Sequence, residues 1–367
     1  MTRIVEVSVG VLAYEPAIQW PGASGPQSAT IMRIRTAGGV EGVSVTWNDS
    51  PSPDAMALTI AAWFREALIG IDVASHPAST EALLKRAAWN GTSCVAVAAV
   101  DNALWDARGK AAGLPVHALL GTRHQSLPVY AASRAELGMT EFEAVADHVG
   151  EAREAGYRAY KLHLWGGAER DIAGCEFVRK RVGNNYTLMF DPLERYSLIE
   201  AVAVGRALER LEYAWFEDPI PADQRAAYAW LAERLTIPLV AADALQWSWN
   251  DYAQAAASRC PIMFRIDAGR QGITFASRIV SQASVHGVRC EIHAFGPEAN
   301  SVAGLHVGLA QPLESHYEAC FPRADFEIPG IKVPTALGAD GRIACPREAG
   351  LGNQIDWSTL KPLLRWI

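Results

Sequence analysis

The chain has 367 residues, of which 50% are hydrophobic, and 40 acidic against 33 basic side chains give a formal net charge of −7. This is the composition of an ordinary soluble globular protein, and its acidic balance with dispersed Lys and Arg argues against a nucleic acid partner. The longest apolar run, Cys94 to Val100, is far shorter than the roughly 20 residues of a membrane helix, and the N-terminus lacks a signal peptide's apolar core, so we expect a cytoplasmic protein with no membrane partner.

The first third of the chain predicts an α+β domain. Apolar and polar residues alternate from Val5 to Val11 and again from Val43 to Trp47, a period of two that indicates half-buried antiparallel strands. The segment from Gln19 to Ser28 is rich in Pro and Gly and is expected to form a loop with Trp20 at its tip. Helices are predicted from Pro53 to Ile69, from Thr80 to Trp89 and from Val95 to Ala112, with Gly113 as the C-cap of the last.

From Pro128 to about residue 318, short β-rich runs alternate with helical stretches, which predicts a parallel sheet. Eight strands fit a closed barrel. Two helices are expected to begin with capping boxes, Thr140 with Glu143 and Ser197 with Glu200. We divide the chain into a capping domain, residues 1–125 completed by 325–367, and a barrel domain, residues 126–324. The predicted strands are Val129–Ala132, Ala159–Leu164, Thr187–Asp191, Ala214–Glu217, Leu239–Asp243, Met263–Asp267, Arg289–His293 and Ser315–Glu318.

The last residue of each of six successive predicted strands is ionisable. These residues recur every 24 to 26 residues, which is about the length of one strand and helix together. In an eight-stranded α/β barrel, the C-terminal strand ends converge on one mouth, where the catalytic groups lie. We therefore expect six side chains to share one cavity: Asp191, Glu217, Asp243, Asp267, His293 and Glu318.

Three of these residues, Asp191, Glu217 and Asp243, predict a metal site. A single acid at a strand end more often caps a helix or fixes a turn. Three acids on neighbouring strands, about 4.8 Å apart, would repel one another unless a cation lay between them. Because all the ligands are oxygens, the pattern favours one Mg²⁺ ion with positions left for water and substrate.

Basic side chains are expected on two sides of that ion. Lys161 and His163 are two residues apart on one strand, so both point the same way, towards the acids. His293 approaches from the other side of the barrel, and Asp267 on the adjacent strand is placed to accept its imidazole N–H and to stabilise the imidazolium. Trp20 and Trp47 could each either close over a substrate or pack between the two domains.

Several longer motifs accompany these residues. They are Val100-Asp101-Asn102-Ala103-Leu104-Trp105-Asp106, Gly109-Lys110, Gly113-Leu114-Pro115, Tyr160-Lys161-Leu162-His163, Phe216-Glu217-Asp218-Pro219, Asp267 with Arg270 and Gly272-Ile273-Thr274, His293, and Gly350-Leu351-Gly352. With them, nearly the whole chain resembles the enolase superfamily, specifically its mandelate racemase-like branch, the mandelate racemase/muconate lactonizing enzyme family.

The resemblance implies a fold and a chemistry. The fold is a (β/α)7β modified TIM barrel with an α+β capping domain built from both chain ends, in a homo-oligomer. The chemistry is Mg²⁺-assisted removal of the proton α to a carboxylate by a Lys or His base. By the same resemblance, Lys161 holds or neutralises the substrate carboxylate and Glu318 hydrogen-bonds its other side.

Three positions depart from that branch. His163 stands where a second lysine is usual, Asp243 stands where Glu is usual, and Leu193 replaces a polar residue that often follows the first metal ligand. These changes leave open whether His163 or His293 is the first base, and they bear on the substrate more than on the metal.

We favour dehydration of a sugar acid to a 2-keto-3-deoxy acid. A racemase or epimerase of an α-hydroxy acid needs the same residues and is the nearest alternative. A non-catalytic protein that binds a metal or a carboxylate is the weaker third hypothesis, because the acid/base residues accompany the predicted ligands.

Overall fold

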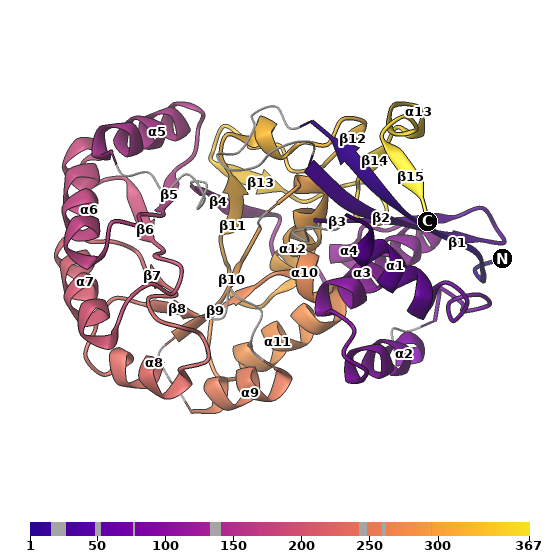
Figure 1. The fold of residues 1–367 in the computed structure, drawn as a ribbon, viewed down its shortest axis with the longest axis horizontal. Coiled ribbons are helices and arrows are strands. Elements are labelled where there is room, and N and C mark those ends of the chain that lie inside the picture. Colours follow the sequence, from indigo (N-terminus) through magenta and orange to yellow (C-terminus); the bar gives the residue numbers. More distant parts are fainter. Residues whose placement is uncertain are drawn as a thin grey trace.

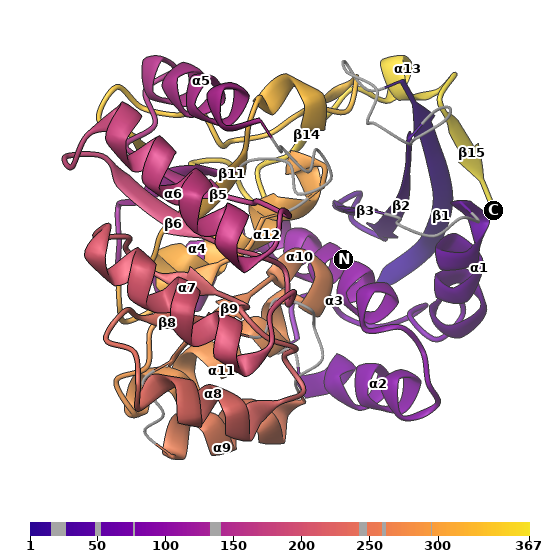
Figure 2. The same cartoon turned by 60° about the vertical axis from the view of Figure 1, so that its left-hand side comes forward.

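The structure is a computed structural model that describes residues 1–15, 27–47, 53–75, 78–132, 141–241, 248–258, 262–294 and 296–367. Trp20, Thr140 and Asp243 lie outside these ranges. Figure 1 shows a capping domain beside a barrel, with both chain termini in the capping domain. Figure 2 shows the same two parts after rotation, with helices α5 to α8 covering the near side of the barrel.

The capping domain contains an antiparallel sheet with the strand order β15-β1-β2-β3, which confirms the predicted antiparallel strands. Val9 and Val11 are buried as the alternation predicts, but Val5 is 53% exposed. The register of β1 against β2 shifts between Ile4 and Glu6, and such a bulge turns the next side chain to the other face. The elements are β1 (Ile4–Tyr14), β2 (Gln27–Thr36), β3 (Glu41–Trp47), β15 (Leu364–Trp366), α1 (Pro53–Phe64), α2 (Ala78–Trp89) and α3 (Cys94–Ala112).

Helix α3 connects the sheet to the C-terminal tail. It ends at Gly113, whose φ of 68° is the left-handed conformation of the predicted C-cap. Midway along the helix, the buried Asp106 carboxylate accepts hydrogen bonds from Val43 N at 2.7 Å and from Leu351 N at 2.8 Å, and it pairs with Lys110. One side chain thus holds the sheet, the helix and the tail together.

The barrel domain has eight parallel strands, β4 to β11, closed by pairing of β11 with β4, for example Tyr317 with Val129. This confirms the predicted (β/α)7β barrel. The strands are β4 (Ser126–Ala132), β5 (Ala159–Leu162), β6 (Thr187–Phe190), β7 (Phe216–Glu217), β8 (Leu239–Ala241), β9 (Ile262–Ile266), β10 (Cys290–Ile292) and β11 (Tyr317–Cys320).

One of the two predicted capping boxes is present at the start of a connecting helix. Ser197 and Glu200 form the box at the start of α7. The other box is wrong, because α5 begins at Phe142 and Glu143 is therefore only its second residue; packing of the Phe142 ring on Phe177 of α6 accompanies this start. The helices are α4 (Val116–Leu120), α5 (Phe142–Glu154), α6 (Ala168–Val182), α7 (Leu198–Arg210), α8 (Arg225–Ala232), α9 (Trp249–Ala257), α10 (Ala268–Gln271), α11 (Ile273–Val285) and α12 (Glu298–Ala310).

The C-terminal tail contacts both domains. Strand β13 (Arg342–Ala344) pairs with β4 of the barrel, whereas β15 pairs with β1 of the capping domain. Between them lie β12 (Ile331–Lys332), β14 (Gln354–Ile355) and helix α13 (Trp357–Leu360). Among the described helices, none combines the length and the apolar character that crossing a bilayer requires.

Two stacked histidines lie where α4, α12 and the tail meet. The His117 and His306 ring centres are 5.5 Å apart, and His306 is fully buried. His306 Nδ1 accepts a hydrogen bond from His117 N, so its Nε2 is the nitrogen that donates to Leu351 O. Burial lowers the pKa of His306 to about 3, against the opposing effect of the Leu351 hydrogen bond.

The low pKa of His306 predicts that the protein becomes less stable in mild acid. Between pH 6.5 and 3 the unfolded chain binds a proton on His306 that the folded chain does not, so the free energy of unfolding decreases as the pH falls. From pH 7 to pH 5 we expect this histidine to account for about 2 kcal/mol of the decrease. Urea unfolding at both pH values should show this part of the decrease missing in His306→Gln and retained in His286→Gln, a control at an exposed histidine. Equal decreases in all three proteins would contradict the assignment.

Candidate active site

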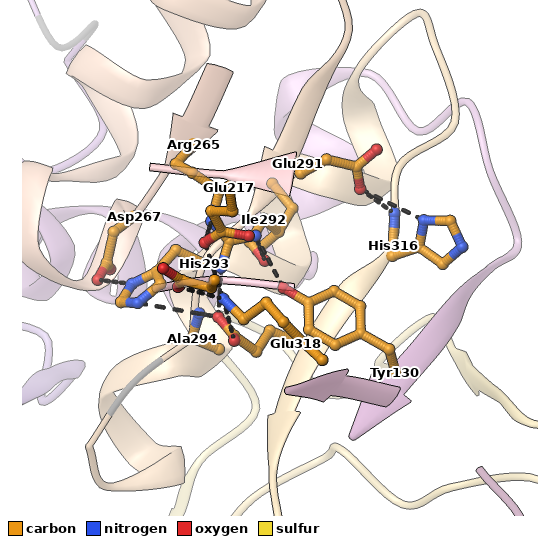
Figure 3. Close-up of polar contacts among 12 residues, drawn as sticks. Tyr130, Glu217, Arg265, Asp267, Glu291, Ile292, His293, Ala294, His316 and Glu318 are labelled. Atoms are coloured by element: carbon orange, nitrogen blue, oxygen red, sulfur yellow. Dashed lines mark hydrogen bonds and ion pairs between the residues drawn. The ribbon is translucent and has the colours of Figure 1, made fainter. Parts of the chain in front are cut away.

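The predicted site residues that the structure describes come together inside the barrel, and Figure 3 shows four of them, Glu217, Asp267, His293 and Glu318. Side chains along β5 alternate between the two faces of the strand, and this alternation decides which of them reach the barrel interior. Leu162 and Leu164 pack into the apolar layer between the strands and the outer helices, so Lys161 and His163 point to the interior of the barrel. Asp191, Asp267 and His293 are each the first residue after the end of a strand.

Lys161 is the centre of the site. Its ammonium nitrogen lies 2.7 Å from Glu217 Oε1, 2.9 Å from Glu318 Oε1 and 3.3 Å from Asp191 Oδ2, and the side chain is 2% exposed. Burial and the nearby Arg265 act to lower the pKa of Lys161, but Glu217 and Glu318 outweigh them and raise it well above its ordinary value. Lys161 is therefore a fixed cation, and a proton acceptor must be sought elsewhere in the site.

Arg265 on β9 is a second buried cation, which we did not predict. Its Nε lies 2.9 Å from Glu217 Oε1, its Nη2 pairs with Glu318 Oε2, and its Nη1 donates to the Tyr130 hydroxyl at 2.8 Å (Figure 3). The sequence held a signal for it, because Arg265 precedes Asp267 by two residues on a predicted strand and so shares its face. Lys161 and Arg265 together neutralise two of the carboxylates that the barrel buries.

His293 and Asp267 form the predicted pair. His293 Nδ1 lies 2.8 Å from Asp267 Oδ2, and Asp267 Oδ1 accepts from Arg270 N at 3.0 Å, which fixes the carboxylate. Because an ionised carboxylate only accepts hydrogen bonds, Nδ1 carries the proton in this pair. His293 Nε2 faces Glu318 Oε2 at 3.8 Å.

Glu318 is held as an anion. Its carboxylate accepts from Arg265 and Lys161, and from Ala294 N at 3.1 Å. Burial acts to raise the pKa of Glu318, but Lys161 and Arg265 outweigh it, and the pKa lies well below its ordinary value. In this state Glu318 offers acceptors only, so the hydrogen bond to a substrate carboxylate that the resemblance implies requires it to take up a proton first.

His163 is placed against Asp191. The His163 Nε2 atom lies 3.2 Å from Asp191 Oδ2, while Asp191 Oδ1 accepts from Leu193 N at 2.8 Å. Burial acts to raise the pKa of Asp191, but Lys161 and then His163 outweigh it, and the pKa lies well below its ordinary value. Leu193 thus contributes its backbone N–H to the site. Its φ of 54° is in the left-handed region, as is the φ of Glu194.

Two of the three predicted metal ligands converge. Asp191 and Glu217 contact the same ammonium of Lys161, so positive charge is stabilised between them, and their hard oxygens suit Mg²⁺. Glu217 Oε2 also accepts from Trp215 Nε1 at 3.0 Å. The third predicted ligand, Asp243, lies outside the described residues, and within the described part of the chain no group of three or more His, Cys, Asp or Glu side chains is arranged to hold a metal ion.

Comparison with known families supports the same architecture. The family model for the enolase C-terminal domain-like fold matches residues 144–359, and the model for the mandelate racemase/muconate lactonizing enzyme N-terminal domain matches residues 4–121. The chain belongs to the enolase superfamily. Together the two matches cover both the capping domain and the barrel of its mandelate racemase/muconate lactonizing enzyme branch.

Individual relatives differ in their reactions. The chain is 26% identical to a D-galactarolactone cycloisomerase of Agrobacterium fabrum, over 86% of this chain and 87% of the relative. It is 28% identical to an L-talarate/galactarate dehydratase of Salmonella typhimurium, over 78% and 72%. The crystal structure of D-glucarate dehydratase from Agrobacterium tumefaciens complexed with magnesium superimposes with a TM-score of 0.85 at 25% identity, covering 99% of both chains. The relatives thus include sugar acid dehydratases as well as racemases and cycloisomerases.

The buried position of Arg265 leads to a prediction about stability. Replacing it with Met leaves Glu217 and Glu318 in the barrel interior with one cation fewer, and breaking such a buried pair costs about 3–5 kcal/mol. We expect Arg265→Met to lower the free energy of unfolding by that amount in urea titrations. Arg278→Gln breaks the more exposed pair with Glu81 and should cost less than about 1 kcal/mol. Similar losses in both variants would contradict the role given to Arg265.

Proposed function

We propose that the protein removes the proton α to the carboxylate of a sugar acid and expels the β-hydroxyl, yielding a 2-keto-3-deoxy acid. One observation carries this proposal: the two oxygens of Glu318 face Lys161 on one side and His293 on the other. A cation suited to a substrate carboxylate therefore stands next to an imidazole that Asp267 holds by its other nitrogen. These are the two groups that α-proton removal needs.

Each residue has a definite task in this proposal. Lys161, a permanent cation, binds and partly neutralises the substrate carboxylate. His163 or His293 takes the α-proton. His293 Nε2, as the imidazolium that Asp267 stabilises, then gives a proton to the departing β-hydroxyl so that water leaves; His293 carries this proton from the α-carbon if it is the base, and is protonated from the start if His163 is the base. Glu318 lies between Lys161 and His293 and orients the part of the substrate that reaches both.

We propose that Asp191, Glu217 and Asp243 hold one Mg²⁺ ion per subunit. Bound there, the ion would supply Lewis-acid stabilisation of the charge that builds up on the substrate carboxylate as its α-proton leaves. Two features support it: the hard oxygens of Asp191 and Glu217 converge on a position that already stabilises positive charge, and the related D-glucarate dehydratase is complexed with magnesium.

A racemase or epimerase of an α-hydroxy acid is the second candidate. The observation that favours it is the placement of His163 and His293 directly after β5 and β10, strands that are not neighbours in the barrel, since racemisation needs a base on either face of one carbon. A non-catalytic binding protein is the third, and the ordered His293–Asp267 pair argues against it because binding alone does not require an oriented base.

Proton NMR in D₂O separates the candidates. With Mg²⁺ and a panel of mono- and diacid sugars, dehydration should remove the α-proton signal of one acid and produce a 2-keto product. Uptake of deuterium with inversion and without a new product would support the racemase instead. If no α-hydroxy acid exchanges its α-proton, the proposed function is wrong.

Two substitutions separate acid/base chemistry from metal binding. His293→Asn removes the exchanging nitrogen and should abolish product formation, while calorimetry should find Mg²⁺ affinity within about twofold of the wild type. Asp243→Asn removes a negative ligand and should weaken both. An Asp243→Asn variant with unchanged Mg²⁺ affinity would exclude Asp243 from the metal site.

A further inference from the structure

Two side chains at the rim of the barrel mouth form a stacked pair, which we call the rim pair: Trp165 and Arg195. Trp165 follows His163 by two residues in the loop after β5, and Arg195 follows Asp191 by four residues in the loop after β6. The Arg195 guanidinium carbon lies 4.3 Å from the centre of the Trp165 ring. The pair thus belongs to the two loops that also carry His163 and Asp191.

Trp165 comes shortly after two site residues in the sequence. Lys161 and His163 point into the site, and Leu164 is buried in the apolar layer under the outer helices. Trp165 comes two residues after His163 in the same loop and is half-buried. Its indole Nε1 is buried and finds no hydrogen-bond acceptor among the described residues.

The guanidinium N–H groups of Arg195 are also available for a ligand. The residue is exposed, and within the described ranges its guanidinium makes neither a hydrogen bond nor an ion pair. Asp171 is close enough to feel its charge, but the Asp171 oxygens already accept from Tyr196 Oη at 2.6 Å and Gly166 N at 2.8 Å. A guanidinium that lies over an indole ring still has N–H groups for other partners, and two of them can bind one carboxylate with two hydrogen bonds.

The charge of the site below explains why a cation at the rim matters. Among the described residues, Lys161 and Arg265 are already in contact with three carboxylates, Asp191, Glu217 and Glu318. A substrate with one carboxylate has Lys161 to receive it. In the proposed function Lys161 is the cation for one substrate carboxylate, so a second carboxylate at the far end of the substrate needs another, and the rim pair offers one together with an indole N–H that has no acceptor among the described residues.

We propose that the rim pair binds the second carboxylate of a dicarboxylic sugar acid, whose first carboxylate is held by Lys161. This inference deepens the proposed function and rests on it, since it assigns the substrate class to diacid sugars rather than to monoacids. Arg195 and Trp165 are then residues that determine specificity and take no part in proton transfer.

Galactarate and galactonate test the inference, because they differ only at the terminal carbon, a carboxylate in the first and an alcohol in the second. Calorimetry on the wild-type chain should find tighter binding of galactarate. Loss of a charged hydrogen-bond partner in Arg195→Gln should weaken galactarate binding about 10- to 100-fold and leave galactonate binding within about twofold. Trp165→Phe keeps a ring under the guanidinium but removes the N–H and should weaken galactarate alone, by about fivefold.

Arg181→Gln is the matched control, because Arg181 is an exposed arginine in the last turn of α6 and should change neither affinity. The inference is overturned if the wild type does not bind galactarate, if Arg195→Gln weakens both acids equally, or if it weakens neither. Its failure is distinguishable from that of the proposed function. α-Proton exchange from galactarate that is unchanged in Arg195→Gln would refute only the diacid assignment, whereas Arg195-dependent galactarate binding without exchange from any acid would refute only the proposed reaction.

Discussion

The candidate active site depends on a set of charges buried inside the barrel: Lys161 and Arg265 against Glu217, Glu318 and Asp191. Removing a charge from water costs several kcal/mol, and the cost is recovered only when opposite charges lie within hydrogen-bond distance. Here each carboxylate contacts Lys161, and Glu217 and Glu318 also contact Arg265. Because each member keeps the others ionised, the set fixes the protonation states on which the proposed chemistry relies. Lys161 is kept from acting as a base, and the transferable proton is left to the histidines.

The capping domain positions the other half of the site. On α3, Asn102 Nδ2 donates to Ala268 O at 2.9 Å, and its Oδ1 accepts from Ile273 N at 3.1 Å. The neighbouring Asp101 accepts from both the backbone and the hydroxyl of Thr274. The short helix α10, which these bonds hold at both ends, begins directly after Asp267. Helix α3 of the capping domain thus holds the barrel segment that begins after Asp267, the residue that orients His293. This is a physical role for the long sequence motif around Asp101 and Asn102.

The sequence allowed the barrel and most of the site to be predicted because strand ends are periodic. Acids and a histidine at regular intervals, and Lys161 two residues before His163, follow from one rule about alternation and one about the mouth of a barrel. Local exceptions escaped that reasoning. The bulge that exposes Val5 and the start of α5 at Phe142 depend on pairing and packing with distant segments. Arg265 was missed because an arginine in a predicted core strand is usually assigned to the surface, and only the two carboxylates across the barrel make its burial favourable.

The two histidines of the site are not equivalent, and this bears on the reaction. His293 is held through Nδ1 by Asp267, a carboxylate that also accepts from Arg270 N at the start of α10, so the ring stays in place while its Nε2 accepts and gives a proton in the proposed reaction. His163 instead directs Nε2 to Asp191, whose oxygens also face Lys161 and a proposed metal ion. A racemase uses a base on each face in the same way in both directions, whereas dehydration asks one group to take a proton and another to give one. Unequal surroundings of the two imidazoles suit unequal tasks, and they favour the dehydratase over the racemase.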